Sequence, residues 1–356
     1  MNVTFLVGNG FDLQMGLRSS FTDFERHYVD LPVDDPAIII FKGGIAGNIE
    51  KWSDFENKLG DFTAAFPVDE QDQFLHCLDD YTTELIKYLS SEEAKYRYFC
   101  VEIRREMRRS FRTFNEHVFS KVDRERNRVF KQHVEYRFIS FNYTHVFDWY
   151  ISNLAKNSKH LQSQYAFRDN HYKTILFSHV IHVHGELPGP VILGVDNTDQ
   201  IRQEAWATDE RFKRKLIKPE ISKRAGSSVG KEVESILHNS DIICIYGMSL
   251  GETDKKWWVE IGKWLLLKGK KLFIQVYTPL DSTIELTHQK AFELEDRIID
   301  RFCDYSDFTP EERAIVESKI TVLINPDMFN IRNIIKKLKS DEKDRETLLR
   351  RLGYEN

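Results

Sequence analysis

The chain begins with the feature that most constrains its fold, a short apolar segment that runs directly into a glycine loop. Val3–Val7 is rich in β-branched and aromatic residues and is followed at once by Gly8–Gly10, so we expect a buried strand that ends in a tight turn. Glycine tolerates positive φ and lets the backbone approach a ligand closely. A helix that begins near Asp12 would direct its free amide groups over this loop, where a pyrophosphate would fit.

The residues after the loop bear on whether it is a plain turn or a phosphate site. Leu13 stands where the dinucleotide fingerprint needs a third glycine, so the loop alone fits both interpretations. The chain then returns to glycine at Gly16 and continues through Ser19–Phe24. A second glycine turn so close to the first predicts a folded lid over the strand end, instead of a helix that runs on. This favours the phosphate site.

Composition excludes several classes of protein. The 356 residues are 41% hydrophobic and 30% charged, an ordinary soluble composition, and a net charge of −5 argues against a general nucleic-acid-binding surface. The sequence has no apolar run of about 18 residues and no basic-then-apolar leader, so neither a membrane span nor a signal peptide is expected. The four cysteines are far apart and form no C-x-x-C pair. We therefore expect a cytoplasmic protein without a disulfide or a structural zinc site.

Buried-strand patterns alternate with helical patterns in the second half of the chain. The predicted strands there are 137–141, 179–184, 191–194, 241–246, 271–277 and 320–324, with helices at about 254–268 and 282–303. This alternation is typical of a parallel sheet covered by helices on both faces. We predict an α/β, Rossmann-like fold of about six strands, which binds its ligand at the carboxyl ends of the strands.

A long helical stretch interrupts this pattern. Between about 31 and 135 apolar residues recur mainly at helical spacing, which predicts a helical insertion. The predicted division is a core of 1–30 plus 136–326, an insertion of 31–135 and a charged helical tail of 327–356. Within the insertion, the basic run 104–131 has local glutamate partners and no interleaved aromatic residues. That composition favours a solvated helix over a nucleic-acid surface.

Polar residues follow four of the predicted strands. Because the ends of parallel strands meet at one edge of a sheet, we expect these groups to converge. Taken singly, each has a plain explanation such as a helix cap or a structural histidine, but together they indicate a site. We expect the side chains of His182 and His184 to leave opposite faces of the strand and not to chelate one metal ion. The four segments are Gly8–Asp12, Asn142–Thr144, His182–Gly185 and Gly247–Asp254.

With these residues in view, the sequence resembles the bacteriophage abortive-infection AbiH family of bacterial proteins. Members carry the motifs G-N-G-F-D, W-x-D-x-E, F-N-Y-T, H-h-H-G and G-x-S-L-G-x-[ST]-D in this order. The resemblance spans residue 1 to about 325 and implies an antiphage effector. Its helical insertion and tail are then candidates for self-association or for contact with a phage or partner-protein trigger. The motifs stand here at Gly8–Asp12, Trp52–Glu56, Phe141–Thr144, His182–Gly185 and Gly247–Asp254.

The same order of motifs is remotely similar to the sirtuins. Their G-A-G loop is similar to Gly8–Gly10, their Q-N-x-D asparagine to Asn142, their H-G to His184-Gly185 and their G-T-S-L to Gly247–Leu250. This resemblance implies an NAD-binding, Rossmann-like core. The paired C-x-x-C motifs of the sirtuin zinc module are absent, so protein deacylation is not expected. Asn9 replaces the loop alanine and Tyr143-Thr144 follow Asn142, which implies a different nucleotide geometry there.

These resemblances assign roles to particular residues. Asn142 would position the nicotinamide ribose, and His184 would act as the general base. NAD would bind without a metal through Gly8, Asn9, Gly10, Asp12, Gly247, Ser249 and Asp254. Trp52, Asp54 and Glu56 have no predicted role.

Three functions are compatible with these residues. The first is hydrolysis of NAD at the nicotinamide–ribose bond, and the second is nucleotide sensing without turnover. The third is a nucleic-acid-targeting effector that uses the basic helices, although the sequence shows no paired-carboxylate metal motif on a strand.

Overall fold

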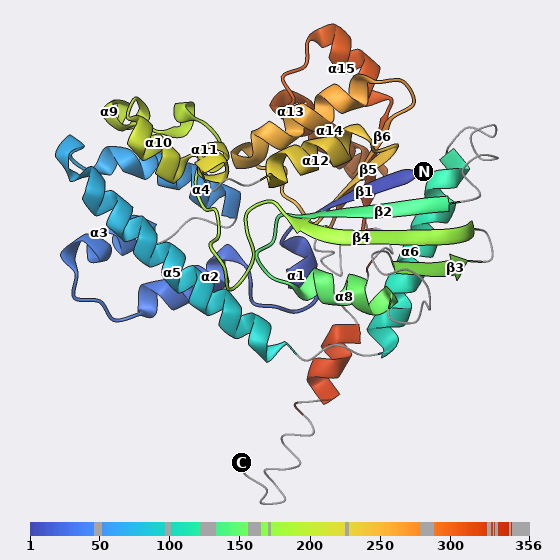
Figure 1. The fold of residues 1–356 in the computed structure, drawn as a ribbon, viewed down its shortest axis with the longest axis horizontal. Helices are drawn as coiled ribbons and strands as arrows, with labels where there is room; N and C mark the ends of the chain where they lie inside the picture. Colours follow the sequence, from blue (N-terminus) through green and yellow to red (C-terminus); the bar gives the residue numbers. More distant parts are fainter. Residues whose placement is uncertain are drawn as a thin grey trace, which may run out of the picture.

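A seven-stranded sheet forms the centre of the molecule, with strand order β3-β4-β2-β1-β5-β6-β7 (Figure 1). The structure is a computed structural model that describes residues 1–45, 52–96, 101–121, 133–155, 165–169, 172–224, 228–277, 288–325, 329, 331, 334–341 and 343. The strands are β1 (Asn2–Val7), β2 (His133–Ser140), β3 (Tyr165–Asp169), β4 (Tyr172–His182), β5 (Ile242–Tyr246), β6 (Lys271–Val276) and β7 (Ile320–Ile324).

The predicted α/β class and parallel sheet are confirmed. Six strands run parallel, and only the edge strand β3 is antiparallel to its neighbour β4. From β1 the chain builds β2 and β4 on one side, then returns to build β5, β6 and β7 on the other. The strand order therefore reverses at β1, the kind of position where open α/β sheets bind ligands.

Two strand predictions were wrong in detail. The segment 191–194 is a loop, and the nearest pairing is an isolated bridge between Val195 and Ile217. Leu193 is buried against the helices beside the sheet, so its apolar character serves packing instead of a strand. Sequence patterns also missed β3 and the first half of β4. These segments pair with each other at the edge, with Tyr165 opposite Phe177.

The strand register brings the site segments to one level. Val7, the last residue of β1, pairs with Ser140 of β2 and with Tyr246 of β5. Ser140 in turn pairs with His182 at the end of β4. The loops that follow these four strands therefore leave the sheet side by side.

Helices cover both faces of the sheet because β1 directs alternate side chains to opposite faces. Phe5 packs in the cluster that contains Phe111 and Tyr150, whereas Leu6 packs in the cluster of Trp258 and Phe302. The helices on the Phe5 face are α1 (Gly10–Gln14), α6 (Val101–Lys121) and α8 (Val146–Ala155), and those on the Leu6 face are α12 (Val229–His238), α13 (Lys255–Leu266), α14 (His288–Tyr305) and α15 (Pro310–Glu317) (Figure 1).

A separate helical lobe lies beside the strand ends, around its own apolar cluster (Figure 1). Residues 204–217 of the predicted core contribute to it, whereas α6 of the predicted insertion packs on the sheet. The division into 1–30 plus 136–326, 31–135 and 327–356 stays a prediction. The helical lobe comprises α2 (Phe21–Asp30), α3 (Pro36–Ile45), α4 (Trp52–Phe62), α5 (Gln71–Lys95), α9 (Glu204–Ala207), α10 (Glu210–Leu216) and α11 (Lys218–Arg224).

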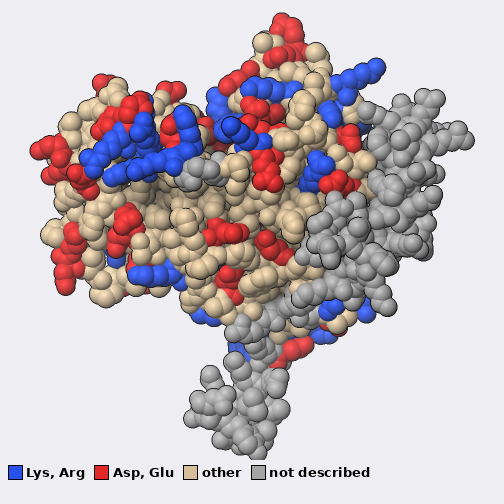
Figure 2. All heavy atoms as spheres, viewed as in Figure 1, with Lys and Arg blue, Asp and Glu red and all other residues tan. Residues whose placement is uncertain are grey.

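Charges of both signs are spread over the face shown in Figure 2, with Lys and Arg gathered over α10 and α11. In the basic run, Arg108 donates to the carbonyl of Leu154 and Arg109 pairs with Glu106. The exposed Arg109 fits the interpretation of a solvated helix, whereas the partly buried Arg108 packs against α8; residues 122–131 lie outside the described part of the chain. In the described ranges, no helix is both long enough and apolar enough to cross a membrane.

Candidate active site

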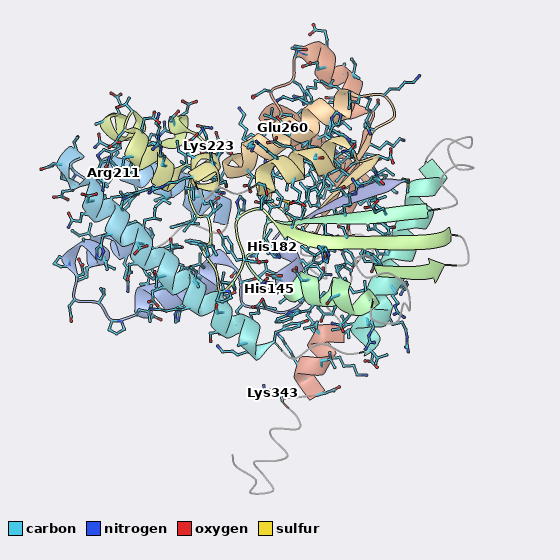
Figure 3. All side chains as sticks on the ribbon, in the orientation of Figure 1. His145, His182, Arg211, Lys223, Glu260 and Lys343 are labelled. Atoms are coloured by element: carbon cyan, nitrogen blue, oxygen red, sulfur yellow. The ribbon has the colours of Figure 1, made fainter. Side chains whose placement is uncertain are left out.

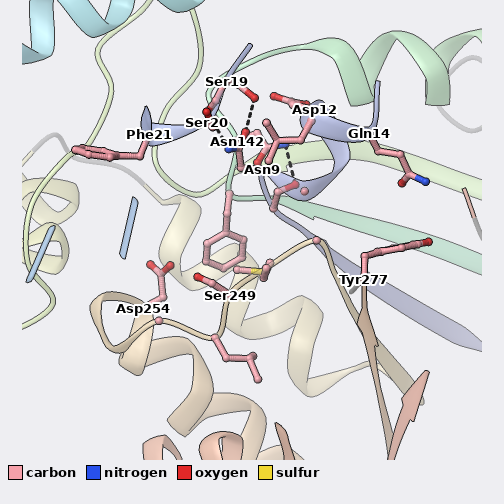
Figure 4. Close-up of a pocket in the computed structure, with 18 of the residues that line it drawn as sticks. Asn9, Asp12, Gln14, Ser19, Ser20, Phe21, Asn142, Ser249, Asp254 and Tyr277 are labelled. Atoms are coloured by element: carbon pink, nitrogen blue, oxygen red, sulfur yellow. Dashed lines mark hydrogen bonds between the residues drawn. The ribbon is translucent and has the colours of Figure 1, made fainter. Parts of the chain in front are cut away.

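A cavity of about 810 Å³ opens at the carboxyl ends of the central strands (Figure 4). Its volume lies within the range of roughly 300–1,000 Å³ that is usual for small-molecule sites. The prediction that the four strand ends converge is confirmed, and every residue predicted for the site lines this cavity. These residues are Gly8, Asn9, Gly10, Asp12, Asn142, His184, Gly247, Ser249 and Asp254.

The glycines of the first loop bring two strand ends together. The amides of Gly8 and Gly10 donate to the carbonyls of Tyr246 and Gly247, at 2.9 and 2.8 Å. A Cβ on Gly10 would lie 2.6 Å from the Cα of Gly247, whose own φ is +66°. The amides of Gly8 and Gly10 are thus bonded within the chain. These two amides are therefore not free to bind the pyrophosphate that was expected over this loop.

The predicted lid is present. Helix α1 has five residues and ends before Gly16, which has a φ of +87°. The side chain of Asn9 then ties the returning chain to the loop: its Nδ2 donates to the carbonyl of Ser19 at 2.8 Å, and Ser19 Oγ donates to its Oδ1 at 2.6 Å. Asn9 therefore shapes the cavity by holding the lid (Figure 4).

Two buried side-chain oxygens at the cavity, one on Asp12 and one on Asn142, accept no hydrogen bond within the described residues. Asp12 is 1% exposed, and its Oδ2 accepts a hydrogen bond from Thr144 Oγ1. Asn142 donates through Nδ2 to the carbonyl of Gly8 at 3.2 Å. Within the described residues, Asp12 Oδ1 and Asn142 Oδ1 have no hydrogen-bond partner. Buried acceptors are normally satisfied, so a ligand with hydroxyl or amide donors suits this part of the cavity.

Burial also changes the acidity of Asp12. Loss of solvent raises its pKa to about 7, against the opposing hydrogen bond from Thr144. This carboxyl can consequently gain or lose a proton near neutral pH.

His184 forms a pair with Asp254, a residue from a different predicted motif. His184 follows β4, and its Nε2 lies 3.0 Å from Oδ1 of Asp254 in the turn Glu252–Asp254. The ring of Phe141 meets the imidazole edge-on, with centroids 5.4 Å apart. The carboxylate accepts a hydrogen bond, so the proton of the neutral ring belongs on Nε2, and Nδ1 is the nitrogen left to exchange a proton.

Sequence analysis missed the other half of this cluster. The Nζ atom of Lys218 lies 2.7 Å from Glu56 Oε2 and 3.4 Å from Asp254 Oδ1, and all three residues line the cavity. Glu56 had been noted without a role, and a buried glutamate needs a partner. Lys218 belongs to no recognised motif, so no signal pointed to it. Asp54 is exposed on α4, and the side chain of Trp52 lies outside the described residues.

The charged groups of this cluster shift one another's pKa values. Burial favours the neutral carboxyl of Asp254, but Lys218 and His184 outweigh it and hold the pKa of Asp254 well below its usual range. Burial likewise opposes the charge of Lys218, but Asp254 and Glu56 raise the pKa of the ammonium. For Glu56, burial raises the pKa; the charge of Lys218 opposes this shift, and the nearby carboxylate of Asp254 adds to it.

His182 and His184 contact different partners, although two residues at this spacing in a regular strand would share a face. The reason is that β4 ends at His182, so His184 already lies in the turn that follows the strand. The Nδ1 atom of His182, which is labelled in Figure 3, contacts the carbonyl of Asn142 at 2.7 Å, and its Nε2 contacts Asp148 at 3.1 Å. It does not line the cavity of His184. His182 thus supports the backbone of Asn142 from behind. In the described residues, no three His, Cys, Asp or Glu side chains are placed to share a metal ion.

The comparison with protein families matches residues 4–276 to the family described as Bacteriophage abortive infection AbiH. That is well over half of the chain. The chain belongs to this family. Membership indicates a role in bacteriophage abortive infection. Curated proteins gave no match.

The AbiH match covers β1 through β6 and so includes all four strand ends. It stops before α14 and the segment 334–341. These parts supply Arg301 and Lys336, two exposed cations that line the same cavity. The four strand ends of the cavity therefore lie inside the matched region, whereas Arg301 and Lys336 lie outside it.

Proposed function

We propose that this AbiH-family protein hydrolyses NAD at the bond between nicotinamide and ribose, and that this reaction is its effector activity in abortive infection. The observation that carries the proposal is the His184–Asp254 pair. It lines one cavity together with Asp12 and Asn142, at the position where the strand order of the sheet reverses.

The chemistry suits these groups. When the glycosidic C–N bond breaks, its electron pair leaves with nicotinamide, which departs as a neutral molecule and needs no general acid. The ribose becomes oxocarbenium-like, and water adds to it. His184 takes the water proton, while the ionised Asp254 stabilises the imidazolium that forms. The carboxylate of Asp12 binds ribose hydroxyls and opposes the positive charge that develops on the sugar.

The phosphates of NAD also have partners. The amides of Gly8 and Gly10 already donate hydrogen bonds within the chain. The pyrophosphate therefore binds the side chains of Arg301 and Lys336 at the cavity mouth. Guanidinium and ammonium groups are the usual partners of phosphate oxygens. Asn142 orients the nicotinamide ribose from the floor.

The test is release of nicotinamide from NAD by purified protein, with and without phage components. His184→Ala should lower the rate about 10²- to 10⁴-fold, the usual loss when a general base is removed, and should leave NAD binding largely intact. His238→Ala, on the exposed end of α12 and away from the cavity, is the matched control.

His182→Ala should lower thermal stability and have little effect on the rate, because it breaks the contacts to Asp148 and Asn142. Nicotinamide release by His184→Ala at the wild-type rate would contradict the mechanism.

Nucleotide sensing without turnover is the second candidate, and one contact favours it. Lys339 Nζ donates to the carbonyl of Gly16 in the lid at 2.9 Å, next to Lys336 at the cavity mouth. A bound nucleotide would in that case alter the packing of this outer segment. The same assay separates the two functions: a protein that binds NAD but releases no nicotinamide under any trigger is a sensor.

A further inference from the structure

The cluster around His184 joins two parts of the molecule. His184 and Asp254 follow strands of the sheet, whereas Glu56 belongs to α4 and Lys218 begins α11, both in the helical lobe. The backbone holds Lys218 in place, because its amide donates to the carbonyl of Val195 at 2.9 Å. Side-chain exposure is only 6% for Lys218 and 9% for Glu56. The helical lobe thus delivers a buried ion pair to the histidine pair of the sheet.

We propose that Lys218 and Glu56 are positioning residues for the His184–Asp254 pair. The ammonium of Lys218 keeps Asp254 ionised and placed to accept the Nε2 proton of His184, and Glu56 anchors the ammonium. Two buried carboxylates that share one site do not both ionise unless a cation separates them. Lys218 is that cation, since it contacts Glu56 at 2.7 Å and Asp254 at 3.4 Å.

Other charged groups nearby do not replace Lys218. A second cavity of about 50 Å³ lies against His184, Lys218 and Asp254 and is also lined by Asp196 and Lys256. The Lys256 side chain is paired with Glu234 at 3.1 Å. Among the described residues, Lys218 is the one lysine or arginine within ion-pair distance of Glu56 or Asp254. Removal of its charge therefore leaves an uncompensated buried carboxylate.

The decisive measurement follows the His184 ring itself by nitrogen-15 NMR in protein without NAD. The chain has 12 histidines, and the signal that His184→Gln removes belongs to His184. The wild-type neutral ring should carry its proton on Nε2. In Lys218→Met, Asp254 lies beside Glu56 without the ammonium that contacts both carboxylates. Asp254 is then protonated or displaced, so the ring loses its fixed acceptor and its signals should move toward a mixture of tautomers. Lys223→Met, at an exposed position of the same helix, should keep the wild-type signals.

A double variant separates charge from packing. Glu56→Gln together with Lys218→Met removes both charges of the ion pair, so Asp254 can stay ionised. We expect this double variant to regain the Nε2–H signal that Lys218→Met loses, and Lys218→Arg to retain it. If Lys218→Met does not fold, the double variant and Lys218→Arg still decide the question. A folded Lys218→Met with wild-type His184 signals, or a double variant with no fixed tautomer, overturns the proposal.

The rate readout rests on the proposed NAD hydrolysis, whereas the NMR readout does not. With NAD as substrate, Lys218→Met should lower kcat about 10- to 100-fold, the usual effect of a displaced catalytic group, with little change in KM. The double variant should recover most of that loss. If wild-type protein cleaves no NAD, the proposed function fails while the NMR result still decides whether Lys218 positions His184. An equal loss of kcat in the single and double variants would contradict the charge-balance role.

Discussion

Asp12 is a residue on which ligand binding and stability make opposite demands. It is buried, has one hydrogen bond from Thr144 and leaves its second oxygen without a partner in the described structure. A charged carboxylate in such a place destabilises the folded chain. Its presence is explained if the unpaired oxygen binds ligand, because functional sites often retain groups that stability alone would remove.

The first prediction concerns the substitution Asp12→Asn. Folding raises the pKa of Asp12 from 3.8 to about 7, so the folded state binds a proton that the unfolded state has already released between these values. Wild-type stability should therefore fall as pH rises from about 4 to about 7 because of this residue. Asn keeps an acceptor for Thr144 and cannot ionise. The variant should be more stable than wild type at pH 8, by on the order of 1–3 kcal/mol, and the difference should vanish near pH 4.

Urea unfolding at several pH values measures this difference, and nicotinamide release by the same variant should fall. Equal unfolding free energies of the two proteins at pH 8 would show that the Asp12 carboxylate is not destabilising. Thr144→Val is the comparison at the partner position, since it removes the hydrogen bond but keeps the carboxyl.

At the scale of the elements, the glycine loops after β1 and β5 fix each other. The sequence indicated close backbone approach at the first loop, because glycine allows it. It could not show which partner comes close. Proximity of Gly10 to Gly247 depends on the pairing of β1 with β5, two strands separated by more than two hundred residues in the sequence. A glycine that allows a bound phosphate to come close and a glycine that allows a second loop to come close look the same in the local sequence.

Gly10→Ala tests this packing. The added Cβ would meet the backbone of Gly247 at 2.6 Å, so one strand-end loop must move. We expect a loss of about 1–3 kcal/mol in the free energy of unfolding, the usual cost of overpacking. Gly43→Ala in α3 is the matched control, since its Cβ would have no neighbour within 4 Å. Removal of a helical glycine should leave stability unchanged or raise it by about 0.5–1 kcal/mol.

Chemical denaturation of both variants gives the comparison. An unfolding free energy of Gly10→Ala equal to that of wild type would mean that the two loops are not held at this distance. Nicotinamide release should fall in Gly10→Ala and stay at the wild-type level in Gly43→Ala.

At the scale of the whole molecule, local sequence patterns predict the sheet, but they do not predict the residue that the helical lobe adds to the site. Buried parallel strands are short apolar runs, and their polar ends converge by topology alone, so β1, β5 and β7 and the meeting of Asn142 with His184 followed from local patterns. Lys218 reaches the same site from the helical lobe. Its position depends on how two apolar clusters pack together, and no local pattern records that packing.

The described part of the C-terminal tail also belongs to the site. Ile335 is buried with Met15 and Leu17, the residues on either side of Gly16 in the lid. One position further, Lys336 lines the cavity. The tail was predicted as a candidate for self-association or for contact with a trigger, and that role stays a prediction; the described segment 334–341 packs on the body of the molecule through Ile335. One side of the segment therefore packs against the lid, and the adjacent side faces the cavity.

Three neighbouring substitutions separate these two effects. Ile335→Ala should lower the free energy of unfolding by about 2–5 kcal/mol, as is usual for a fully buried isoleucine, and should weaken NAD binding because the lid loses its support. Lys336→Ala should weaken NAD binding several-fold with little change in stability, because it removes one exposed charge that faces the phosphates. Lys337→Ala, exposed and absent from the cavity lining, should change neither quantity.

Thermal unfolding and calorimetric titration with NAD measure the two effects in each variant. If Lys336→Ala and Lys337→Ala bind NAD equally well, Lys336 does not contact the phosphates, and the pyrophosphate must lie deeper, toward the carbonyl-bonded loop of Gly8–Gly10.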